Sequence, residues 1–371
     1  MAKATYRLEI DASKALIDQP ESGHNRWHPG IAPRVHVKTG DRVIIETRDA
    51  FDGQLTEADT AQLKGISLGR VHPLTGPVYI EGAEPGDLLE AHILDIEAAP
   101  AGFTIIAPNF GFLRDEFSTP FVAGWRIVDG YAESPQVPGV RLTAAAFPGT
   151  IGVAPSLDLM RVINDRERAL AAKGGRVMLP DESGAVPAGK AIAADALRTI
   201  PPRENGGNVD IKQLTRGARV YLPVWEKGAL FSIGDAHFTQ GDSECCGTAV
   251  EMRAAFHLEF QLRKGEAARR KLRDISFARD TYFAPAELAA PKRFHATTGM
   301  SITPEGENHS EDATLAARNA LRHMIEYLQE RGYSREQAYV ICSVAVDLRL
   351  SQLVDVPNFT VTALLPLDIF V

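Results

Sequence analysis

Short apolar runs separated by glycine and a charged residue recur through this chain, and they constrain its fold more than any other feature. Three segments share this form: "RVHVKTGDRVIIETRD", "VYIEGAEPGDLLEAHILDI" and "GARVYLPVWEKGALFSIGDAHF". Gly40, Gly86 and Gly228 lie at their centres, where glycine supplies the positive φ of a tight turn. The runs lack a helical period and are typical of strands. They predict three β-hairpins and a β-rich fold.

Helical periodicity is confined to three later segments. Ser156 is expected to cap a helix in "LDLMRVINDRERALAAKGG", and Ser310 is expected to cap another in "EDATLAARNALRHMIEYLQERG". Ser334 and Gln337 form a capping-box pattern before "AYVICSVAVDLRL". Cys342 lies in the apolar stripe of that segment, so we expect it in the core.

The length of the chain favours more than one structural unit, because 371 residues exceed the size at which a single core usually stops growing. We expect an α+β, β-dominated architecture of β-barrel or β-sandwich units with C-terminal helices packed against them. The expected divisions are a β-rich N-terminal domain over 1–155, a helix and surface excursion over 156–200, and a second β unit over 201–371. The last unit would include the C-terminal helices and a returning strand, "FTVTALLPLDIF".

Charge and hydropathy exclude several classes of partner. A formal net charge of −8 disfavours nucleic acid, whose phosphates require clustered Lys and Arg. No apolar run approaches the roughly 18 residues of a membrane-spanning helix, and the first residues lack the apolar core of a secretion signal. Three cysteines, two of them adjacent, do not make a disulfide framework. We therefore expect no nucleic-acid or membrane partner, and a cytoplasmic protein with reduced thiols.

The segment "GDAHFTQGDSECCGTAVE" concentrates acids, a histidine and two cysteines. Asp235 and His237 are two apart at the end of an apolar strand, so both side chains should point to one face. Gln240, Asp242 and Glu244 have the same spacing on the following segment. Such a cluster can bind a cation, or it can hold carboxyl groups close enough to separate their pKa values. A polar hairpin rich in turn-forming residues is the alternative.

Three further segments carry polar residues beside glycine or proline. Glu84 lies in "EGAEPGD", and Asn208 and Asp210 follow the glycine pair of "RENGGNVD". His72 precedes a proline in "VHPLTGP". The histidines of "HNRWH", including His24, have helical metal-ligand spacing, but the proline and glycine that follow restrict them to a loop.

The order of these segments resembles the acetamidase/formamidase family. The resemblance runs from about residue 20 to the C-terminus through "HNRWHP", "HPLTGPVYIEGAEPGDLLEAHILDI", "PGTIGVAPS", "PPRENGGNVDIKQLTRGARVYLPV" and "GALFSIGDAHFTQGDSECCGTAVE". "HNRWHP" is similar to the formamidase branch, whereas "ECCGTAVE" is similar to the acetamidase branch. The resemblance implies a homo-oligomeric, β-rich enzyme that hydrolyses a short aliphatic amide, of the formamide or acetamide class, to a carboxylate and ammonia.

Amide hydrolysis needs an activated water, a stabilised oxyanion and a proton for the leaving ammonia. We expect a divalent cation, zinc or alternatively calcium, to be bound by Asp235 and His237 with Asp210 or Glu84. Glu244 is the expected proton shuttle, with Glu251 or Glu84 as the second carboxyl group. The expected substrate-binding residues are Gly207, through its backbone amide beside Gly206, together with Asn208, His72 and His24.

Two alternatives remain open from the sequence. Cys246 or Cys245 would act as a nucleophile activated by Glu244, provided that a distant group lowers the thiol pKa. Alternatively, the chain is a non-catalytic β protein whose acids hold a structural calcium ion and whose "GGN" segment contacts a small polar ligand.

Overall fold

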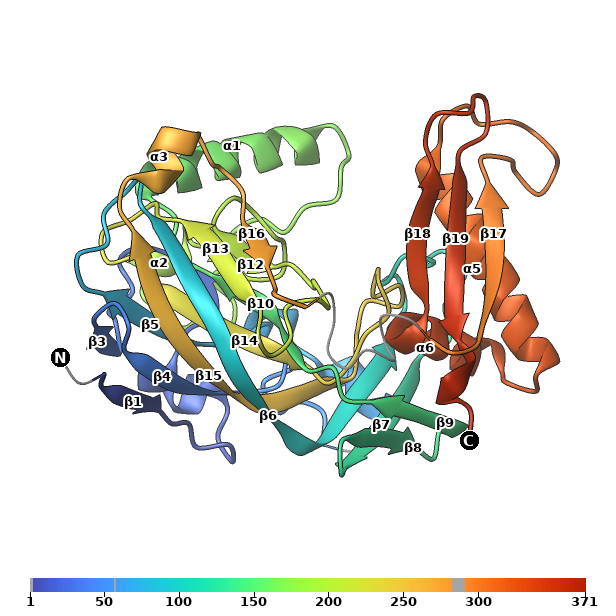
Figure 1. Ribbon diagram of the computed structural model, residues 1–371, viewed down its shortest axis with the longest axis horizontal. Coiled ribbons are helices and arrows are strands. Elements are labelled where there is room, and N and C mark those ends of the chain that lie inside the picture. The colour runs from blue at the N-terminus through green and yellow to red at the C-terminus, as the bar shows by residue number, and fades with distance from the viewer. Residues whose placement is uncertain (1–2, 57, 282–290) are drawn as a thin grey trace.

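The computed structural model describes residues 3–56, 58–281 and 291–371, and strands dominate the fold over these residues (Figure 1). A strongly curved sheet forms the body, and a smaller sheet with two helices stands beside it. Within the described ranges the curved sheet contains 14 strands. The α+β, β-dominated class with C-terminal helices is therefore confirmed.

Two long strands, β6 (Leu88–Ile106) and β15 (Glu251–Arg263), form the spine of the main sheet and pair antiparallel. Alternate residues of β15, such as Phe256, Leu258 and Phe260, are fully buried, as expected for a sheet with one face on the core. The main path through the sheet is β12-β10-β14-β15-β6-β7-β8-β9. The other members of this path are β7 (Phe121–Val128), β8 (Tyr131–Ser134), β9 (Val137–Thr143), β10 (Phe147–Gly152), β12 (Gly206–Asn208) and β14 (Phe231–His237).

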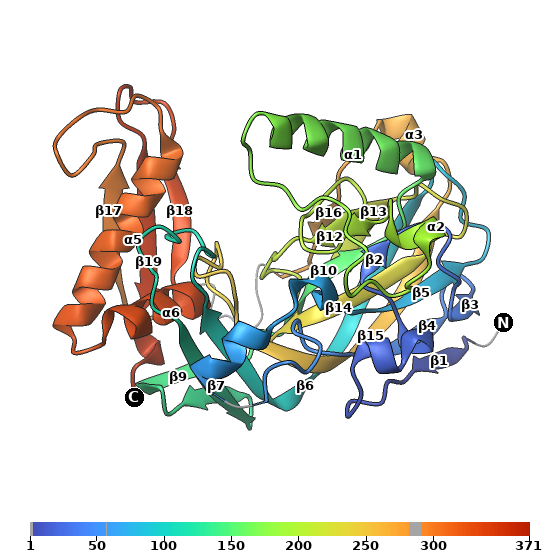
Figure 2. The same cartoon turned by 180° about the vertical axis from the view of Figure 1, so that it is seen from behind.

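Most of the shorter strands pair onto this path, whereas two pair only with each other in a separate sheet, and several helices lie on the body. The helix α1 (Leu157–Ala172) runs across the top in Figures 1 and 2, and Ser156 caps it as predicted by accepting from the Leu159 N–H. The remaining strands and helices are β1 (Thr5–Leu8), β2 (Arg26–Trp27), β3 (Val35–Val37), β4 (Arg42–Thr47), β5 (Leu74–Ile80), β11 (Leu197–Arg198), β13 (Arg219–Pro223), β16 (Ser276–Ala278), α2 (Lys190–Ala193) and α3 (Glu266–Arg270).

The three predicted hairpins are wrong in their pairing, although their strands and turns exist. Gly40, Gly86 and Gly228 have φ values of 89°, 93° and 77°, as tight turns require. The two strands that flank each turn, however, pair with other partners: β3 with β5, β4 with β1 and β15, β13 with β6 and β16, and β14 with β5, β10 and β15. Local turn chemistry marks the strand ends, whereas the partners depend on distant parts of the chain.

Strands from both sides of the predicted boundary at residue 155 interleave in the main sheet. The clearest case is β14, which lies between β10 and β15 and also pairs with β5. The predicted excursion before residue 200 is partly packed, since Val186 and Leu197 are buried and β11 pairs with β2. The division into 1–155, 156–200 and 201–371 remains a prediction.

The C-terminal unit is a three-stranded sheet covered on one face by α5, which lies behind the sheet in Figure 1 and in front of it in Figure 2. The predicted returning strand, β19, pairs with β17 and β18 in this separate sheet. The elements are β17 (Phe294–Met300), α5 (Ala313–Glu330), α6 (Arg335–Ala345), β18 (Asp347–Gln352) and β19 (Thr360–Pro366).

Helix caps in this unit test two of the predictions. The predicted cap at Ser310 is wrong, because Asp312 accepts from the Leu315 N–H and the helix begins at Ala313. The capping box of Ser334 and Gln337 at the start of α6 is confirmed. Cys342 is fully buried in α6, as predicted.

No helix within the described residues has the length and apolar character needed to cross a bilayer.

Candidate active site

Four adjacent strands, β12, β10, β14 and β15, bring the predicted polar residues together. Asn208 on β12 lies opposite Thr150 on β10, and His237 on β14 lies opposite Glu251 on β15. Asp235, also on β14, lies close to Thr150, with its Oδ2 3.1 Å from the Thr150 hydroxyl. Residues directly opposite each other on paired strands have neighbouring side chains. The register of the sheet therefore assembles this cluster from distant parts of the chain.

The turn between β14 and β15 adds Glu244 and Gln240. Ser243 and Glu244 have φ values of 113° and 49°, so this segment does not continue the strand alternation that was expected. As a consequence Asp242 points away from the cluster and faces Lys212, with the carboxylate 3.8 Å from Nζ. Glu244 points inward, and its Oε1 lies 4.0 Å from His237 Nε2.

His237 stands at the centre of the acids. Its Nε2 lies 3.1 Å from Glu251 Oε2 and 3.5 Å from Asp235 Oδ1. The three side chains are almost fully buried. Their ligand-type atoms, and separately those of Asp210, His237 and Glu244, lie within 4.8 Å of one another.

Gln240 fixes the orientation and tautomer of the His237 ring. The His237 Nδ1 lies 3.0 Å from Gln240 Oε1, while Gln240 Nε2 donates to the Asp210 carbonyl at 3.0 Å. Because the Gln240 amide donates from its nitrogen, its oxygen must accept from the Nδ1–H of His237. In the neutral ring the lone pair is then on Nε2 and faces the carboxylates. This is the arrangement that orients a metal-binding histidine.

Five buried polar atoms converge here without a hydrogen-bond partner among the described residues. They are His72 Nδ1, Asp210 Oδ1, Asp235 Oδ1, His237 Nε2 and Glu251 Oε2. Buried polar atoms are nearly always paired, and several unpaired ones at a single point indicate an ion or a reactive site. Carboxylate oxygens and an imidazole nitrogen are suitable ligands for zinc, so the residues present fit a divalent cation.

Burial and mutual charge shift the ionisation of these groups. Burial raises the pKa of Glu244 to about 8 and that of Glu251 to about 7, and the charge of Asp235 adds to both. Burial and the charge of Glu244 raise the pKa of Asp210 well above its usual value. Burial opposes ionisation of Asp235, but the imidazoles of His72 and His237 outweigh it and lower the Asp235 pKa.

His237 is the positive partner of this group. Burial disfavours its charged form, but the carboxylates of Glu251 and Asp235 outweigh burial and raise the pKa of His237 well above its usual value. Groups whose pKa values are pushed apart in this way are typical of acid–base centres.

Gly149 is a residue of the site that sequence reasoning missed. It lies on β10 opposite Asp235, and a Cβ at this position would lie 2.7 Å from His237 Cε1 and 2.8 Å from Asp235 Oδ2. Thr150 and Gln240 were also given no role. The motif "PGTIGVAPS" contains Gly149 and Thr150, but the need for a missing side chain is visible only once the strand opposite is known.

A cavity of about 640 Å³ opens above the acids. The polar residues of its lining include His72, Asn208, Asp235, Glu244 and Glu251, and also Thr60, Lys64, Asn109, Arg176 and Thr248. The His72 ring lies beside Asp235, with Nδ1 3.7 Å from Oδ2, and burial lowers the pKa of His72, which favours the neutral ring.

Asn208 lines this cavity, but its amide is already committed. Its Nδ2 donates to Asp210 Oδ2 at 3.0 Å, and its Oδ1 lies 2.8 Å from the Thr150 hydroxyl. The structure thus brings together His72, Asn208, Asp210, Asp235, His237, Glu244 and Glu251 from the predicted set.

Two predicted site residues, Glu84 and His24, lie elsewhere. Glu84 is half-exposed in the turn before β6, with its carboxylate 3.9 Å from Lys227 Nζ, because the acids around Gly86 serve the turn. His24 pairs with the Ser232 hydroxyl at 2.7 Å and is absent from the cavity walls, so the structure does not bring it to the acids. Burial lowers the pKa of His24 to about 4.

The glycine pair, whose backbone amide at Gly207 was expected to bind substrate, also lies outside the cavity lining. The Gly206 N–H donates to the Arg203 carbonyl at 3.0 Å, so it is not available to a substrate. Gly207 belongs to β12 and packs beside Trp27 and Pro201 rather than in the cavity walls. Of this segment, Asn208 alone lines the cavity.

The adjacent cysteines do not have the environment of a nucleophile. Cys245 and Cys246 are buried and absent from the cavity walls. The Cys246 thiol donates to the Ile105 carbonyl at 3.3 Å, and burial raises its pKa to about 11. Burial also raises the pKa of Cys245 well above its usual value. Reactive thiols need the opposite shift, so these surroundings are those of packed core cysteines.

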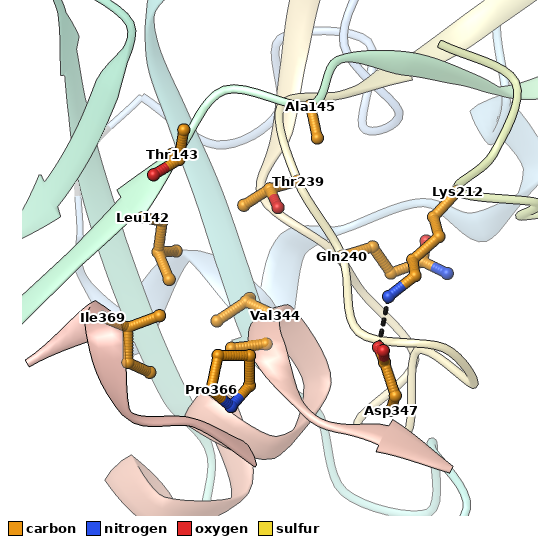
Figure 3. A pocket seen from close by; sticks show the side chains of 11 residues that line it. Leu142, Thr143, Ala145, Lys212, Thr239, Gln240, Val344, Asp347, Pro366 and Ile369 are labelled. Carbon is orange, nitrogen blue, oxygen red and sulfur yellow. Dashed lines mark hydrogen bonds and ion pairs between the residues drawn. The ribbon is translucent and has the colours of Figure 1, made fainter. Parts of the chain in front are cut away.

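A second pocket lies between the body and the C-terminal unit, where Lys212 points at Asp347 (Figure 3). Gln240 lines it as well, so this pocket lies beside the residue that orients His237. Its volume is about 30 Å³, which is the share of a single water in the liquid. It is too small to be the substrate site.

Buried carboxylates around an imidazole, at the floor of a cavity, define a hydrolase-type centre that can direct water at a carbonyl carbon. The comparisons specify the family. The model of the acetamidase/formamidase family matches residues 9–371, and the chain belongs to this family.

Individual relatives agree with this assignment. An acetamidase from Mycolicibacterium smegmatis is 39% identical over 363 residues, which cover 90% of this chain and 88% of that protein. A formamidase from Methylophilus methylotrophus is 36% identical, over 98% of this chain and 93% of that protein. Among solved structures, a γ-lactamase from Delftia acidovorans matches with a TM-score of 0.93 at 35% identity, over 99% of this chain and 93% of that chain.

Proposed function

We propose that this chain hydrolyses short aliphatic amides, of the formamide or acetamide class, to a carboxylate and ammonia with the help of a bound divalent cation. The observation that carries the proposal is the convergence of five buried polar atoms without a hydrogen-bond partner, three of them from the cavity-lining residues His72, Asp235 and Glu251. The printed names of the relatives from Mycolicibacterium and Methylophilus support the substrate class.

Asp235, His237 and Glu251 would hold the cation. They are the more deeply buried of the two ligand groups, and Gln240 orients the His237 ring so that Nε2 faces the two carboxylates. An imidazole with two carboxylates suits zinc better than calcium, which prefers six to eight oxygen ligands. When bound, the cation supplies positive charge that polarises the amide oxygen or lowers the pKa of a bound water.

Glu244 acts as the proton shuttle. It lines the cavity, and its pKa of about 8 lies near neutral pH, where a carboxyl group can both accept and donate a proton. Its carboxylate accepts a proton from water as the oxygen of that water attacks the carbonyl carbon. The same proton then passes to the amide nitrogen as the C–N bond breaks, which yields ammonia and the carboxylic acid. The acid then loses its proton to ammonia or solvent water and becomes the carboxylate.

Asn208 and His72 have supporting roles. Because the Asn208 amide is bonded to Asp210 and Thr150, Asn208 is a positioning residue that holds the Asp210 carboxylate beside Glu244. His72 lines the cavity next to Asp235, where its ring contacts the bound amide. These roles replace the direct substrate contact first expected of Asn208.

Ammonia release from formamide and acetamide, with metal analysis of the same purified protein, tests the proposal. We expect turnover, about one equivalent of metal, loss of activity on dialysis against a chelator, and recovery with zinc. His237→Ala should lose both metal and activity. Full activity in protein that contains no metal would refute the cation, and no release from either amide would refute the substrate class.

A cyclic amide is a second candidate substrate. The γ-lactamase from Delftia acidovorans supports it, because that structure matches nearly the whole chain. Ring opening of a five-membered lactam, followed by the appearance of a primary amine, tests it. We also propose a cytoplasmic homo-oligomer, in line with the family resemblance, and light scattering of the purified protein measures the oligomeric state.

A further inference from the structure

The cavity above the acids is far larger than a formamide or acetamide molecule. One water takes up about 30 Å³ in the liquid, so the four heavy atoms of acetamide fill roughly 120 Å³. The cavity measures about 640 Å³, so about four-fifths of it remains beyond an acetamide bound at the acids.

The walls of this remaining space are mostly apolar, and Thr60, Lys64, Asn109 and Arg176 add polar groups to them. Phe51, Leu63 and Ile66 line one part, next to a small buried cluster that includes Val71 and Ile105. Met178 and Ile200 add further apolar surface. A ligand that fills the cavity must therefore place carbon atoms against most of this wall.

Two large apolar side chains in the cavity lining stay exposed to solvent. Leu68 is 56% exposed and Phe110 is 40% exposed, and both line the same cavity. The Phe110 ring packs directly on the backbone of Gly247, where a Cβ would lie 2.2 Å from the ring. Phe110 therefore stands next to the turn that carries Glu244, with an uncovered face available to a ligand.

We propose that this cavity binds the apolar acyl group of the substrate, and that amides several methylenes longer than acetamide are the better substrates. The inference rests on the proposed function, because the same acids would act on the carbonyl group. The acyl chain, carried on the carbonyl carbon, would extend from the acids past Phe110 toward Leu63 and Ile66 and displace water from these side chains.

Ammonia release by the wild-type enzyme from acetamide, propionamide, butyramide and hexanamide tests the proposal. Burial of one methylene corresponds to about a fourfold gain in affinity, so kcat/KM should rise by about that factor for each added methylene until the cavity is filled. A flat or falling series, with formamide and acetamide still hydrolysed, would overturn the inference alone. No hydrolysis of any of these amides would instead overturn the proposed function.

The side of the amide bond that enters the cavity is tested with N-butylacetamide, which places the chain on the leaving amine. Release of butylamine at a kcat/KM well below that of ammonia from hexanamide is expected. A comparable or larger value would put the apolar chain on the nitrogen side and overturn the assignment to the acyl group.

A variant that fills the cavity tests its location. Ala107 lines the cavity just after β6, whereas Ala98 is an exposed residue of the same strand outside it. Ala107→Phe should lower the ratio of kcat/KM for hexanamide to that for acetamide at least tenfold, and Ala98→Phe should leave this ratio unchanged. Leu68→Ser, at an exposed position with little risk to folding, should lower the same ratio. An unchanged ratio in both Ala107→Phe and Leu68→Ser would overturn the proposal.

Discussion

Gly149→Ala is expected to damage the active site while leaving the fold intact. Gly149 lies on β10 directly opposite Asp235 on β14, and its own φ is not in the left-handed region, so alanine is acceptable to the backbone there. The added Cβ, however, would lie 2.7 Å from His237 Cε1 and 2.8 Å from both His237 Nε2 and Asp235 Oδ2. All three atoms belong to buried side chains at the centre of the acids.

The size of the effect follows from these distances. Ordinary contact begins at about 3.4 Å, so the imidazole and the carboxylate must retreat by roughly 0.7 Å, because 3.4 − 2.7 = 0.7. A displacement of about 1 Å at reacting groups can cost on the order of a hundredfold in rate. We therefore expect kcat/KM to fall about tenfold to a hundredfold. Overpacking of this kind costs about 1–3 kcal/mol of stability, which a protein of this size tolerates.

Kinetics of ammonia release, the metal content and the unfolding temperature of the variant together test this prediction. Gly189→Ala is the matched control, because Gly189 has φ −72° and no atom lies within 4 Å of its added Cβ. The control should retain wild-type activity. A folded Gly149→Ala protein with kcat/KM within twofold of the wild type would refute the packing argument, and with it the position of His237 in the site.

Three further changes probe the acids and their ionisation. Glu244→Gln should lower kcat at least a hundredfold with the metal retained, since it removes the proton shuttle. Glu84→Gln, in the exposed turn, should leave kcat unchanged. Equal kinetics of the two variants would contradict the assignment. Gln240→Met removes the acceptor for the His237 Nδ1–H and should weaken metal binding about tenfold to a hundredfold, measured by competition with a chelator. In metal-free protein the unfolding temperature should fall as pH rises from about 5 to 8. Burial raises the pKa of Glu251 to about 7 and that of Glu244 to about 8, so the folded state loses stability as these two groups lose their protons. A rise of the unfolding temperature over this range would show that the sign is wrong.

Local sequence signals predicted the ends of the strands but not their partners. Gly40, Gly86 and Gly228 adopt the positive φ that the turn pattern required, because turn geometry depends on a few neighbouring residues. The pairing of β14 with β5, β10 and β15 joins segments far apart in the chain, and no local signal encodes it. For the same reason the capping box of Ser334 was predictable, whereas the interleaving of strands across residue 155 was not.

The candidate site shows the same limit. Asp235 and His237 were found because a spacing of two on a strand is a local rule, and the turn after them carries Glu244. Glu84 was included because acids beside glycine look alike in sequence whether they form a turn or a site. Gly149 was missed because its role is the absence of a side chain opposite Asp235, a requirement that only the sheet register creates.

Three acidic residues of the candidate active site have a strained backbone that lowers the stability of the fold. Asp210, Asp235 and Glu244 have φ values of 48°, 54° and 49°, in the left-handed region that costs side-chain-bearing residues about 1–3 kcal/mol each. These bends direct carboxylates from separate segments onto His237, where their charges repel unless a proton or a cation lies between them. Because backbone strain and like charge coincide at these acids, binding and catalysis explain the arrangement better than folding does. A cation held by Asp235, His237 and Glu251 would offset part of the strain and part of the charge repulsion.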